Sequence, residues 1–147
     1  MELGITYRRP PSVAIWEASR QVSIEESSRV LVVDDDAVIR ETLATALCDE
    51  GYAVRCAEDG RVALDILATW RPDVIVLDLM MPVMNGHAFL AAKAALESAA
   101  RIPVVVMSAA HQISRQAAAL NAAAVFSKPF DLGALLDTVA RLVTEVL

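Results

Sequence analysis

Short apolar runs alternate with longer helix-like segments from Arg29 to the end of the chain. The apolar runs are rich in β-branched residues and have the length of strands. They predict five strands, at 30–33, 52–56, 74–77, 104–107 and 124–127. The first, third and fourth of these runs are almost wholly apolar, which is typical of parallel strands that are buried on both faces.

The segments between these runs predict five helices, at 37–50, 60–70, 87–98, 113–120 and 132–146. Gly51 and Asn121 mark the ends of the first and fourth helices, because both residue types favour a left-handed cap. Regular alternation of strands and helices indicates an α/β domain with a parallel sheet covered on both faces. Right-handed crossovers leave few topologies for such a chain. We expect the flavodoxin-like, doubly wound five-stranded sheet with strand order 2-1-3-4-5.

Residues 1–28 break this pattern and are interpreted as an N-terminal extension and linker, so that the α/β domain occupies residues 29–147. A short helix is expected at about 13–21. The extension is either an unattached tail or a segment whose Ile15 and Trp16 dock on the domain or on a neighbouring copy in a homodimer. The sequence leaves these alternatives open.

Composition excludes several classes of function. Of the 147 residues, 56% are hydrophobic and 22% are charged, which is typical of a globular protein. The net charge of −6 argues against direct DNA binding, because phosphate recognition requires a basic surface. Cys48 and Cys56 form no disulfide framework and lack metal-ligand spacing, so we expect buried thiols. No apolar run is long enough for membrane insertion and no signal peptide is evident, which predicts a cytoplasmic protein.

Acidic residues follow two strands that the predicted topology places side by side. Asp34, Asp35 and Asp36 come directly after the first strand, and Asp78 ends the third. The carboxyl ends of these strands border the ligand crevice of the expected fold. Carboxylates gathered in a small space require a cation to remain ionised. Oxygen ligands favour Mg²⁺, and the absence of His and Cys from these loops argues against zinc or copper.

Two further polar residues follow the remaining strands of this sheet edge. Ser108 ends the fourth strand and Lys128 ends the fifth. A carboxylate nucleophile, a metal, a hydroxyl and a fixed positive charge are the requirements of phosphoryl transfer, with Asp78 as the nucleophile. Each residue alone has an ordinary explanation: Asp36, for example, suits a helix N-cap. The joint occurrence at one sheet edge favours a functional site.

Four motifs resemble the receiver domain of two-component response regulators: VLVVDDD, DVIVLDLMMPVMNG, PVVVMSA and KPF. The resemblance covers roughly residues 29–147. It implies that Asp78 accepts a phosphoryl group from the phosphohistidine of a sensor histidine kinase or phosphotransfer protein. The domain would then signal through contacts with a downstream protein that the sequence does not identify.

The resemblance also implies roles for the other site residues. Asp35 would bind Mg²⁺ directly, Asp34 would reach it through water, and Asp78 and the backbone carbonyl of Met80 would complete the protein's ligands. Ser108 and Lys128 would each contact a phosphoryl oxygen, and Lys128 would be joined to Pro129 by a cis peptide bond. Such a domain is not an enzyme beyond its own Mg²⁺-dependent phosphorylation and slow dephosphorylation.

The chain departs from the receiver pattern at two places. Val125 occupies a position where the family carries an aromatic residue that responds to phosphorylation, and Phe126 follows on the opposite face of the strand. Output through a different surface or through backbone shifts is then expected. Met80 and Ala110, each two residues beyond a site residue, are apolar and cannot orient an attacking water. This predicts a long-lived acyl phosphate.

Two competing functions remain to be weighed. A phosphorylation-independent interaction module with the same fold is favoured by Val125 and opposed by the intact set of acids. A haloacid-dehalogenase-like phosphatase would explain the Asp-x-Asp at 34–36, but the Gly-Thr that usually follows is Ala37-Val38 here, and Asp78 would have no role. No output domain follows residue 147, so we expect a single-domain regulator or a receiver taken from a longer protein.

Overall fold

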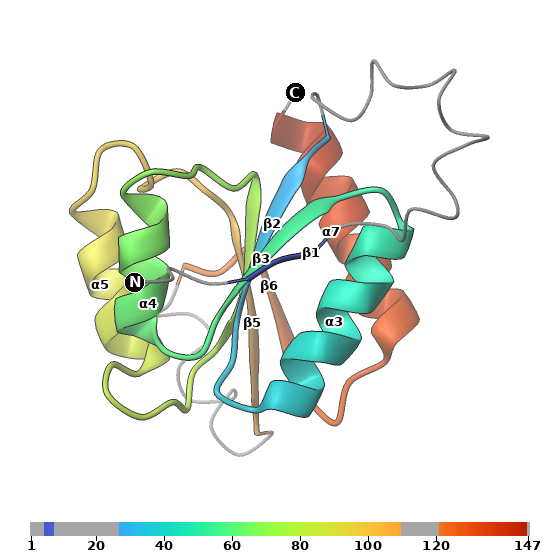
Figure 1. Cartoon of the computed structure of the whole chain (residues 1–147), viewed down its shortest axis with the longest axis horizontal. Helices are drawn as coiled ribbons and strands as arrows, with labels where there is room; N and C mark the ends of the chain where they lie inside the picture. Colours follow the sequence, from blue (N-terminus) through green and yellow to red (C-terminus); the bar gives the residue numbers. More distant parts are fainter. Residues whose placement is uncertain (1–4, 8–26, 110–120, 147) are drawn as a thin grey trace.

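The computed structural model describes residues 5–7, 27–109 and 121–146, which form one sheet flanked on both faces by helices (Figure 1). The sheet has six strands in the order β1-β3-β2-β4-β5-β6. The strands are β1 Ile5–Tyr7, β2 Arg29–Val33, β3 Ala53–Ala57, β4 Val74–Asp78, β5 Val104–Ala109 and β6 Ala124–Lys128. From β3 to β6 along the sheet, all neighbours pair in parallel, which confirms the predicted 2-1-3-4-5 order of the domain.

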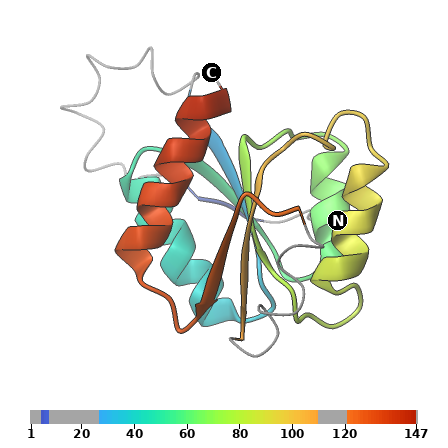
Figure 2. The same cartoon turned by 180° about the vertical axis from the view of Figure 1, so that it is seen from behind.

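Four helices are found in the described part of the chain: α3 Ala37–Asp49, α4 Gly60–Leu67, α5 Gly86–Ala94 and α7 Leu132–Val146. Helices α3 and α7 cover one face of the sheet, and α4 and α5 cover the other, as the two opposite views show (Figures 1 and 2). The helices predicted at 13–21 and 113–120 lie outside the described residues, as do Ile15 and Trp16. Within this part of the chain no helix is long and apolar enough to cross a bilayer.

Helices α4 and α5 end earlier than the sequence pattern predicts. The sequence predicts that α4 continues to residue 70, but the helix is capped at Ala68. The backbone N–H of Trp70 donates a hydrogen bond to the carbonyl of Ile66. Predicted to continue to residue 98, α5 is capped at Ala95. The Lys93 ammonium donates to the carbonyl of Ala100 at 3.1 Å, which holds the following turns against the end of α5.

The N-terminal extension contributes an edge strand that the sequence analysis did not predict. Strand β1 pairs antiparallel with β3, with Ile5 opposite Cys56 and Tyr7 opposite Val54. The pairing occupies backbone groups of β3 that would otherwise form an open sheet edge. The extension is therefore part of the sheet at these three residues.

Two hydrophobic clusters, one on each face of the sheet, form the core. Alternate residues of β2 divide between them: Val30 and Val32 pack with α3 and α7, whereas Leu31 and Val33 pack with α4 and α5. The same alternation places Phe126 against the first cluster and Val125 against the second. This confirms that Phe126 lies on the opposite face of the strand from Val125.

Gly51 and Asn121 adopt the predicted left-handed backbone conformation, and the two cysteines are buried thiols as predicted. Gly51 has φ 99° and Asn121 has φ 52°. Cys48 and Cys56 are buried and unbridged. Burial raises the pKa of the Cys56 thiol to about 12, with the positive charge of Arg40 acting in the opposite direction. Such a thiol stays protonated and unreactive at neutral pH.

Candidate functional site

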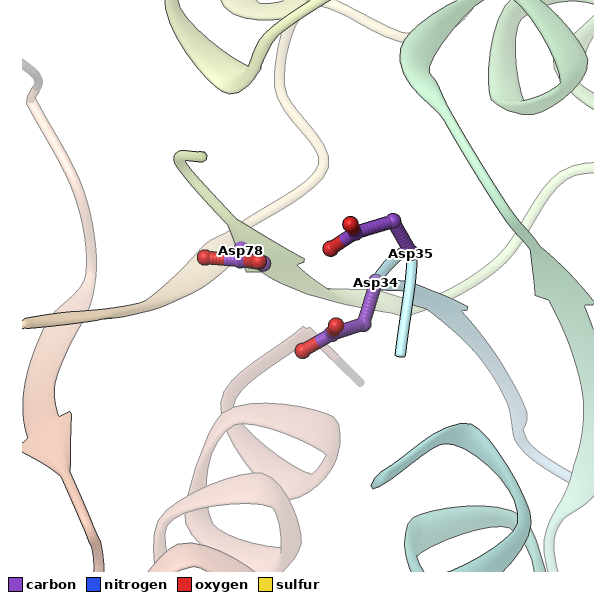
Figure 3. A group of neighbouring side chains, drawn as sticks. All are labelled: Asp34, Asp35 and Asp78. Carbon is purple, nitrogen blue, oxygen red and sulfur yellow. The ribbon is translucent and has the colours of Figure 1, made fainter. Parts of the chain in front are cut away.

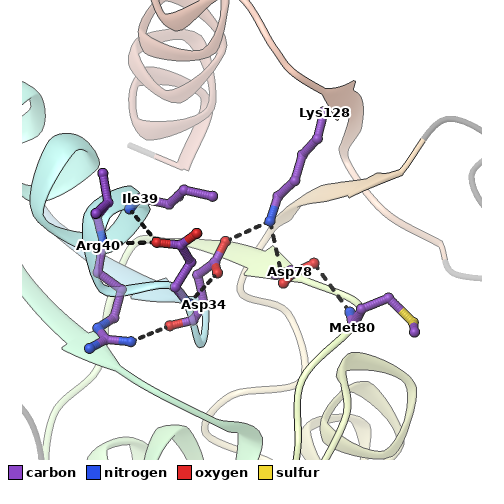
Figure 4. A network of polar contacts seen from close by, with 8 residues as sticks. Asp34, Ile39, Arg40, Asp78, Met80 and Lys128 are labelled. Atoms are coloured by element: carbon purple, nitrogen blue, oxygen red, sulfur yellow. Dashed lines mark hydrogen bonds and ion pairs between the residues drawn. The ribbon is translucent and has the colours of Figure 1, made fainter.

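The end of β2 holds a buried carboxylate, that of Asp34. Its side chain has 0% exposure. One carboxylate oxygen accepts the backbone N–H of Asp36 at 2.9 Å, and the other accepts the Lys128 ammonium at 2.9 Å (Figure 4). The backbone of Asp34 is also fixed, because its N–H donates to the Ala57 carbonyl and its own carbonyl accepts from the Arg40 guanidinium at 2.8 Å. Arg40 was not predicted as part of this site.

The two acids after Asp34 have different surroundings. Asp36 is the N-cap of α3, and its carboxylate accepts the backbone N–H groups of Val38 and Ile39. Its ordinary explanation as a helix cap is thereby confirmed. Asp35 is exposed, and its carboxylate extends beside that of Asp34 toward the end of β4 (Figure 3).

Asp78 ends β4 with a side chain that is nearly buried, its residue being 4% exposed. One carboxylate oxygen accepts the backbone N–H of Met80 at 3.2 Å, and the other lies 3.4 Å from the Lys128 ammonium. Burial and the charge of Asp34 raise the pKa of Asp78, although the Met80 N–H and Lys128 oppose the shift. The carboxylate therefore lies in a site where added positive charge would stabilise its ionised form.

Lys128, the last residue of the edge strand β6, contacts both of these acids. Burial alone would lower the pKa of Lys128, but its hydrogen bond to Asp34 and the charges of Asp34 and Asp78 raise it overall. The lysine is thus charged at neutral pH. The peptide bond between Lys128 and Pro129 is cis, as predicted.

The structure brings Asp34, Asp35, Asp78 and Lys128 together as the sequence predicts. Ser108 is fully buried near the end of β5, the strand that pairs with β4. Met80 is 56% exposed, and its N–H points to Asp78. The predicted roles of the Ser108 hydroxyl and the Met80 carbonyl stay predictions, and Ala110 lies outside the described residues.

The donor set fits a hard divalent cation. Asp34, Asp35 and Asp78 each offer one carboxylate oxygen, and these atoms all lie within 4.8 Å of one another. Lys128 supplies one positive charge against three carboxylates, which leaves the cluster negative. Carboxylate oxygens in this number suit Mg²⁺, which also retains several waters.

The glycine at the start of α5 was missed by the sequence analysis. A Cβ at Gly86 would lie 2.7 Å from the Cα of Leu79 and 2.9 Å from the carbonyl oxygen of Asp78. The Gly86 N–H donates to the Leu79 carbonyl at 2.9 Å. Gly86 therefore lets α5 pack directly on the backbone that carries Asp78.

The fold and site together define a doubly wound α/β domain with an acidic cluster, bridged by a lysine, at the carboxyl ends of its strands. Residues 30–140 match the model of the response regulator receiver domain. The chain belongs to this family, the receiver module of two-component systems. That assignment leaves the haloacid-dehalogenase alternative without support.

Individual relatives agree with the family assignment. The response regulator MprA of Mycolicibacterium vanbaalenii is 42% identical over 110 residues, which are 74% of this chain and 47% of that protein. MprA of Mycobacterium bovis is 41% identical over 112 residues, 75% of this chain and 48% of the relative. The chain thus spans about half the length of the curated relatives that it matches.

Solved structures show the same fold. The chemotaxis response regulator CheY4 of Vibrio cholerae superposes with a TM-score of 0.73 at 34% identity, covering 79% of this chain and 98% of that one. The receiver domain of a signal transduction histidine kinase from Syntrophus aciditrophicus gives a TM-score of 0.76 at 27% identity, covering 82% and 92%.

Proposed function

We propose that this domain accepts a phosphoryl group on Asp78 from the phosphohistidine of a sensor histidine kinase or phosphotransfer protein, in a Mg²⁺-dependent reaction. It then signals through contacts with a downstream protein. One observation carries the proposal: Lys128 bridges the buried Asp34 and Asp78 in a cluster of three convergent carboxylates.

The chemistry is a single phosphoryl transfer. A carboxylate oxygen of Asp78 forms the new bond to phosphorus while the bond between phosphorus and the donor histidine nitrogen breaks, and the imidazole leaves with that electron pair. The transferred oxygens carry negative charge throughout, so positioning and charge neutralisation account for most of the rate. Lys128 already lies 3.4 Å from Asp78 and supplies a positive charge where those oxygens arrive. The buried Ser108 is proposed to hydrogen-bond another of them.

The acids and one backbone carbonyl would hold the metal. Asp34 has both carboxylate oxygens bonded within the protein, which suits contact with Mg²⁺ through water. Asp35 is exposed and makes no hydrogen bond with another described residue, which suits direct coordination. Asp78 and the Met80 carbonyl would complete the set. Bound Mg²⁺ would supply positive charge to the phosphoryl oxygens.

Mass spectrometry tests the phosphoacceptor directly. Incubation with acetyl phosphate and Mg²⁺ should add a single phosphoryl group to the parent protein and none to Asp78→Ala. Asp36→Asn removes a neighbouring charge but retains a good helix cap, and it should be modified like the parent. An adduct that persists in Asp78→Ala would place the acceptor elsewhere. No adduct in the parent, under conditions that modify another receiver, would favour a phosphorylation-independent module.

Removing one acid of the cluster should affect stability and metal binding in opposite directions. Asp35→Asn relieves repulsion from Asp34 and Asp78, so the metal-free variant should melt at a higher temperature than the parent. The same variant should lose most of the stabilisation that Mg²⁺ gives the parent, because a ligand that binds only the folded state raises the melting temperature. Thermal denaturation with Mg²⁺ and with EDTA measures both effects. An equal loss of the Mg²⁺ effect in Asp36→Asn would contradict the assignment of Asp35.

The phosphorylated domain should lose its phosphoryl group slowly. The exposed side chain of Met80 carries no polar atom able to orient a water toward the acyl phosphate. Decay of the phosphorylated mass after removal of acetyl phosphate gives the rate. Met80→Asn introduces an amide beside Asp78 and should shorten the half-life, whereas Val83→Asn, also exposed on this loop, should not. A half-life of seconds for the parent would refute the prediction.

One observation favours a phosphorylation-independent role as the second candidate. Val125 stands where the family carries a responsive aromatic residue, and it is packed against the cluster beneath α4 and α5. Phe126 packs on the opposite face and cannot substitute for such a residue. The mass measurement above separates the two candidates.

A further inference from the structure

A pocket lies at the end of the sheet opposite Asp78, where the parallel strands begin. Its volume is about 370 Å³. It is lined where β2 begins, where α4 ends and where the chain approaches β5. The lining residues are Arg29, Leu67, Ala68, Thr69, Trp70, Arg71, Ser98, Ala99 and Ile102. The volume is within the range of small-molecule sites.

The walls of this pocket are apolar and its rim is basic. Leu67, Ala99 and Ile102 are buried side chains on the α4 and α5 face of the sheet. Trp70, also buried, has guanidinium groups over its ring, that of Arg29 at 5.5 Å and that of Arg55 at 4.9 Å from the ring centroid. A guanidinium stacked on an aromatic ring is held in a fixed plane, with its N–H groups directed outward.

Two arginines of the pocket lining, Arg29 and Arg71, have guanidinium groups without an ion-pair partner among the described residues. Arg29 and Arg71 are exposed and form no ion pair with any residue that the structure describes. Arg71 makes one hydrogen bond, to the Ser98 carbonyl at 2.7 Å. The nearby Asp73 carboxylate accepts the backbone N–H of Arg29 and is not among the lining residues. The pocket lining thus carries two positive charges without ion pairs to described residues, in a chain of net charge −6.

We propose that this pocket binds a small apolar molecule that bears one phosphate or carboxylate group. The anionic group would lie between Arg29 and Arg71, which can each donate two parallel hydrogen bonds to such oxygens. The Thr69 and Ser98 residues of the lining would border the same group. The apolar part would occupy the space beside Trp70 and Ile102. The site is remote from the phosphoacceptor, and this inference does not rest on the proposed function.

Phenyl phosphate is a suitable probe. It is titrated into the ¹⁵N-labelled chain of residues 1–147 in EDTA, and binding is followed by NMR. Without a metal, the acidic pocket repels the probe. Saturable shifts are expected at amides 68–71 and 98–102 and not at 34–36 or 78–80. Phenol and inorganic phosphate, which each lack one half of the ligand, should bind at least about tenfold more weakly.

Arginine variants complete the test. Arg29→Gln and Arg71→Gln should each weaken binding by at least about tenfold, the effect of losing one of the two charge-assisted hydrogen bonds that each arginine can donate. Arg61→Gln, an exposed position on α4 that pairs with Asp65, should leave it unchanged. Arg29→Gln retains the hydrogen bond from its backbone N–H to Asp73. If Arg71→Gln unfolds, the affinity of Arg29→Gln for phenyl phosphate therefore tests the proposal alone. The proposal is overturned if these amides show no saturable shift, if inorganic phosphate binds as tightly as phenyl phosphate, or if Arg61→Gln weakens binding equally.

Discussion

Replacing Lys128 with methionine should lower the free energy of unfolding by about 3 kcal/mol in the absence of Mg²⁺, since removing one partner of a buried ion pair leaves an uncompensated charge. The loss would be large because Lys128 serves two acids at once, at 2.9 Å from Asp34 and 3.4 Å from Asp78. Asp34 has no exposure to water that could replace the ammonium. Urea denaturation with EDTA measures the change.

Lys93→Met is the matched control for this prediction. Lys93 and Lys128 are the only lysines of the sequence, and Lys93 is the more buried of the two. Burial lowers the pKa of Lys93, and its ammonium has one hydrogen-bond partner among the described residues, the Ala100 carbonyl. Its replacement removes a poorly solvated charge, so its effect should be well below that of Lys128→Met. Equal losses for the two variants would show that burial of the side chain, and not the pairing with Asp34 and Asp78, determines the stability.

Addition of Mg²⁺ should restore part of the stability lost in Lys128→Met. A cation at the carboxylates compensates for the missing ammonium, and binding to the folded state alone is stabilising. Phosphorylation by acetyl phosphate should nevertheless remain slow. Mg²⁺ would contact one phosphoryl oxygen, and it does not replace the positive charge that Lys128 supplies to another. Recovery of stability without recovery of phosphorylation would separate the structural and chemical contributions of Lys128.

The sheet order and the position of the site could be predicted because both follow from simple physical patterns. Strands buried on both faces are apolar along their central residues, and β2, β4 and β5 meet that requirement, with polar residues only at or near their ends. Once their order is known, the residues after β2 and β4 must lie side by side. Asp34 and Asp78 are therefore placed by topology, without any knowledge of side-chain contacts.

The features that were not predicted depend on contacts between distant segments. Strand β1 has three residues, too few for a periodic pattern, and it exists because β3 offers an open edge. Helix α5 ends at Ala94, and the turns after it contact Lys93 through the carbonyl of Ala100, a contact that no local propensity indicates. Residue pattern and spacing alone likewise could not distinguish Asp34 from Asp35, which only the family resemblance separated. Burial at the strand end and the reach of Lys128 make that distinction.

Gly86→Ala should destabilise the protein by about 2 kcal/mol, the usual effect of forcing an extra methyl group into a filled space. The added Cβ would lie 2.7 Å from the Leu79 Cα and 2.9 Å from the Asp78 carbonyl oxygen. Both are backbone atoms of a buried strand end, so they cannot rotate away as a side chain could. The start of α5 would have to move away from β4 and weaken the bond from the Gly86 N–H to the Leu79 carbonyl.

Gly133→Ala tests whether this loss comes from the contact or from glycine replacement in general. At Gly133, near the start of α7, the Cβ would meet only the carboxylate of Asp131, at 3.2 Å. That side chain can shift, and alanine favours a helix over glycine by about 0.5–1 kcal/mol, so stability should be unchanged or slightly higher. Because α5 packs directly on the backbone of Asp78, the proposed phosphoacceptor, Gly86→Ala should also slow phosphorylation by acetyl phosphate, whereas Gly133→Ala should not. A Gly86→Ala protein with parental stability and rate would show that α5 moves freely relative to Asp78, and the site would then be positioned by the sheet alone.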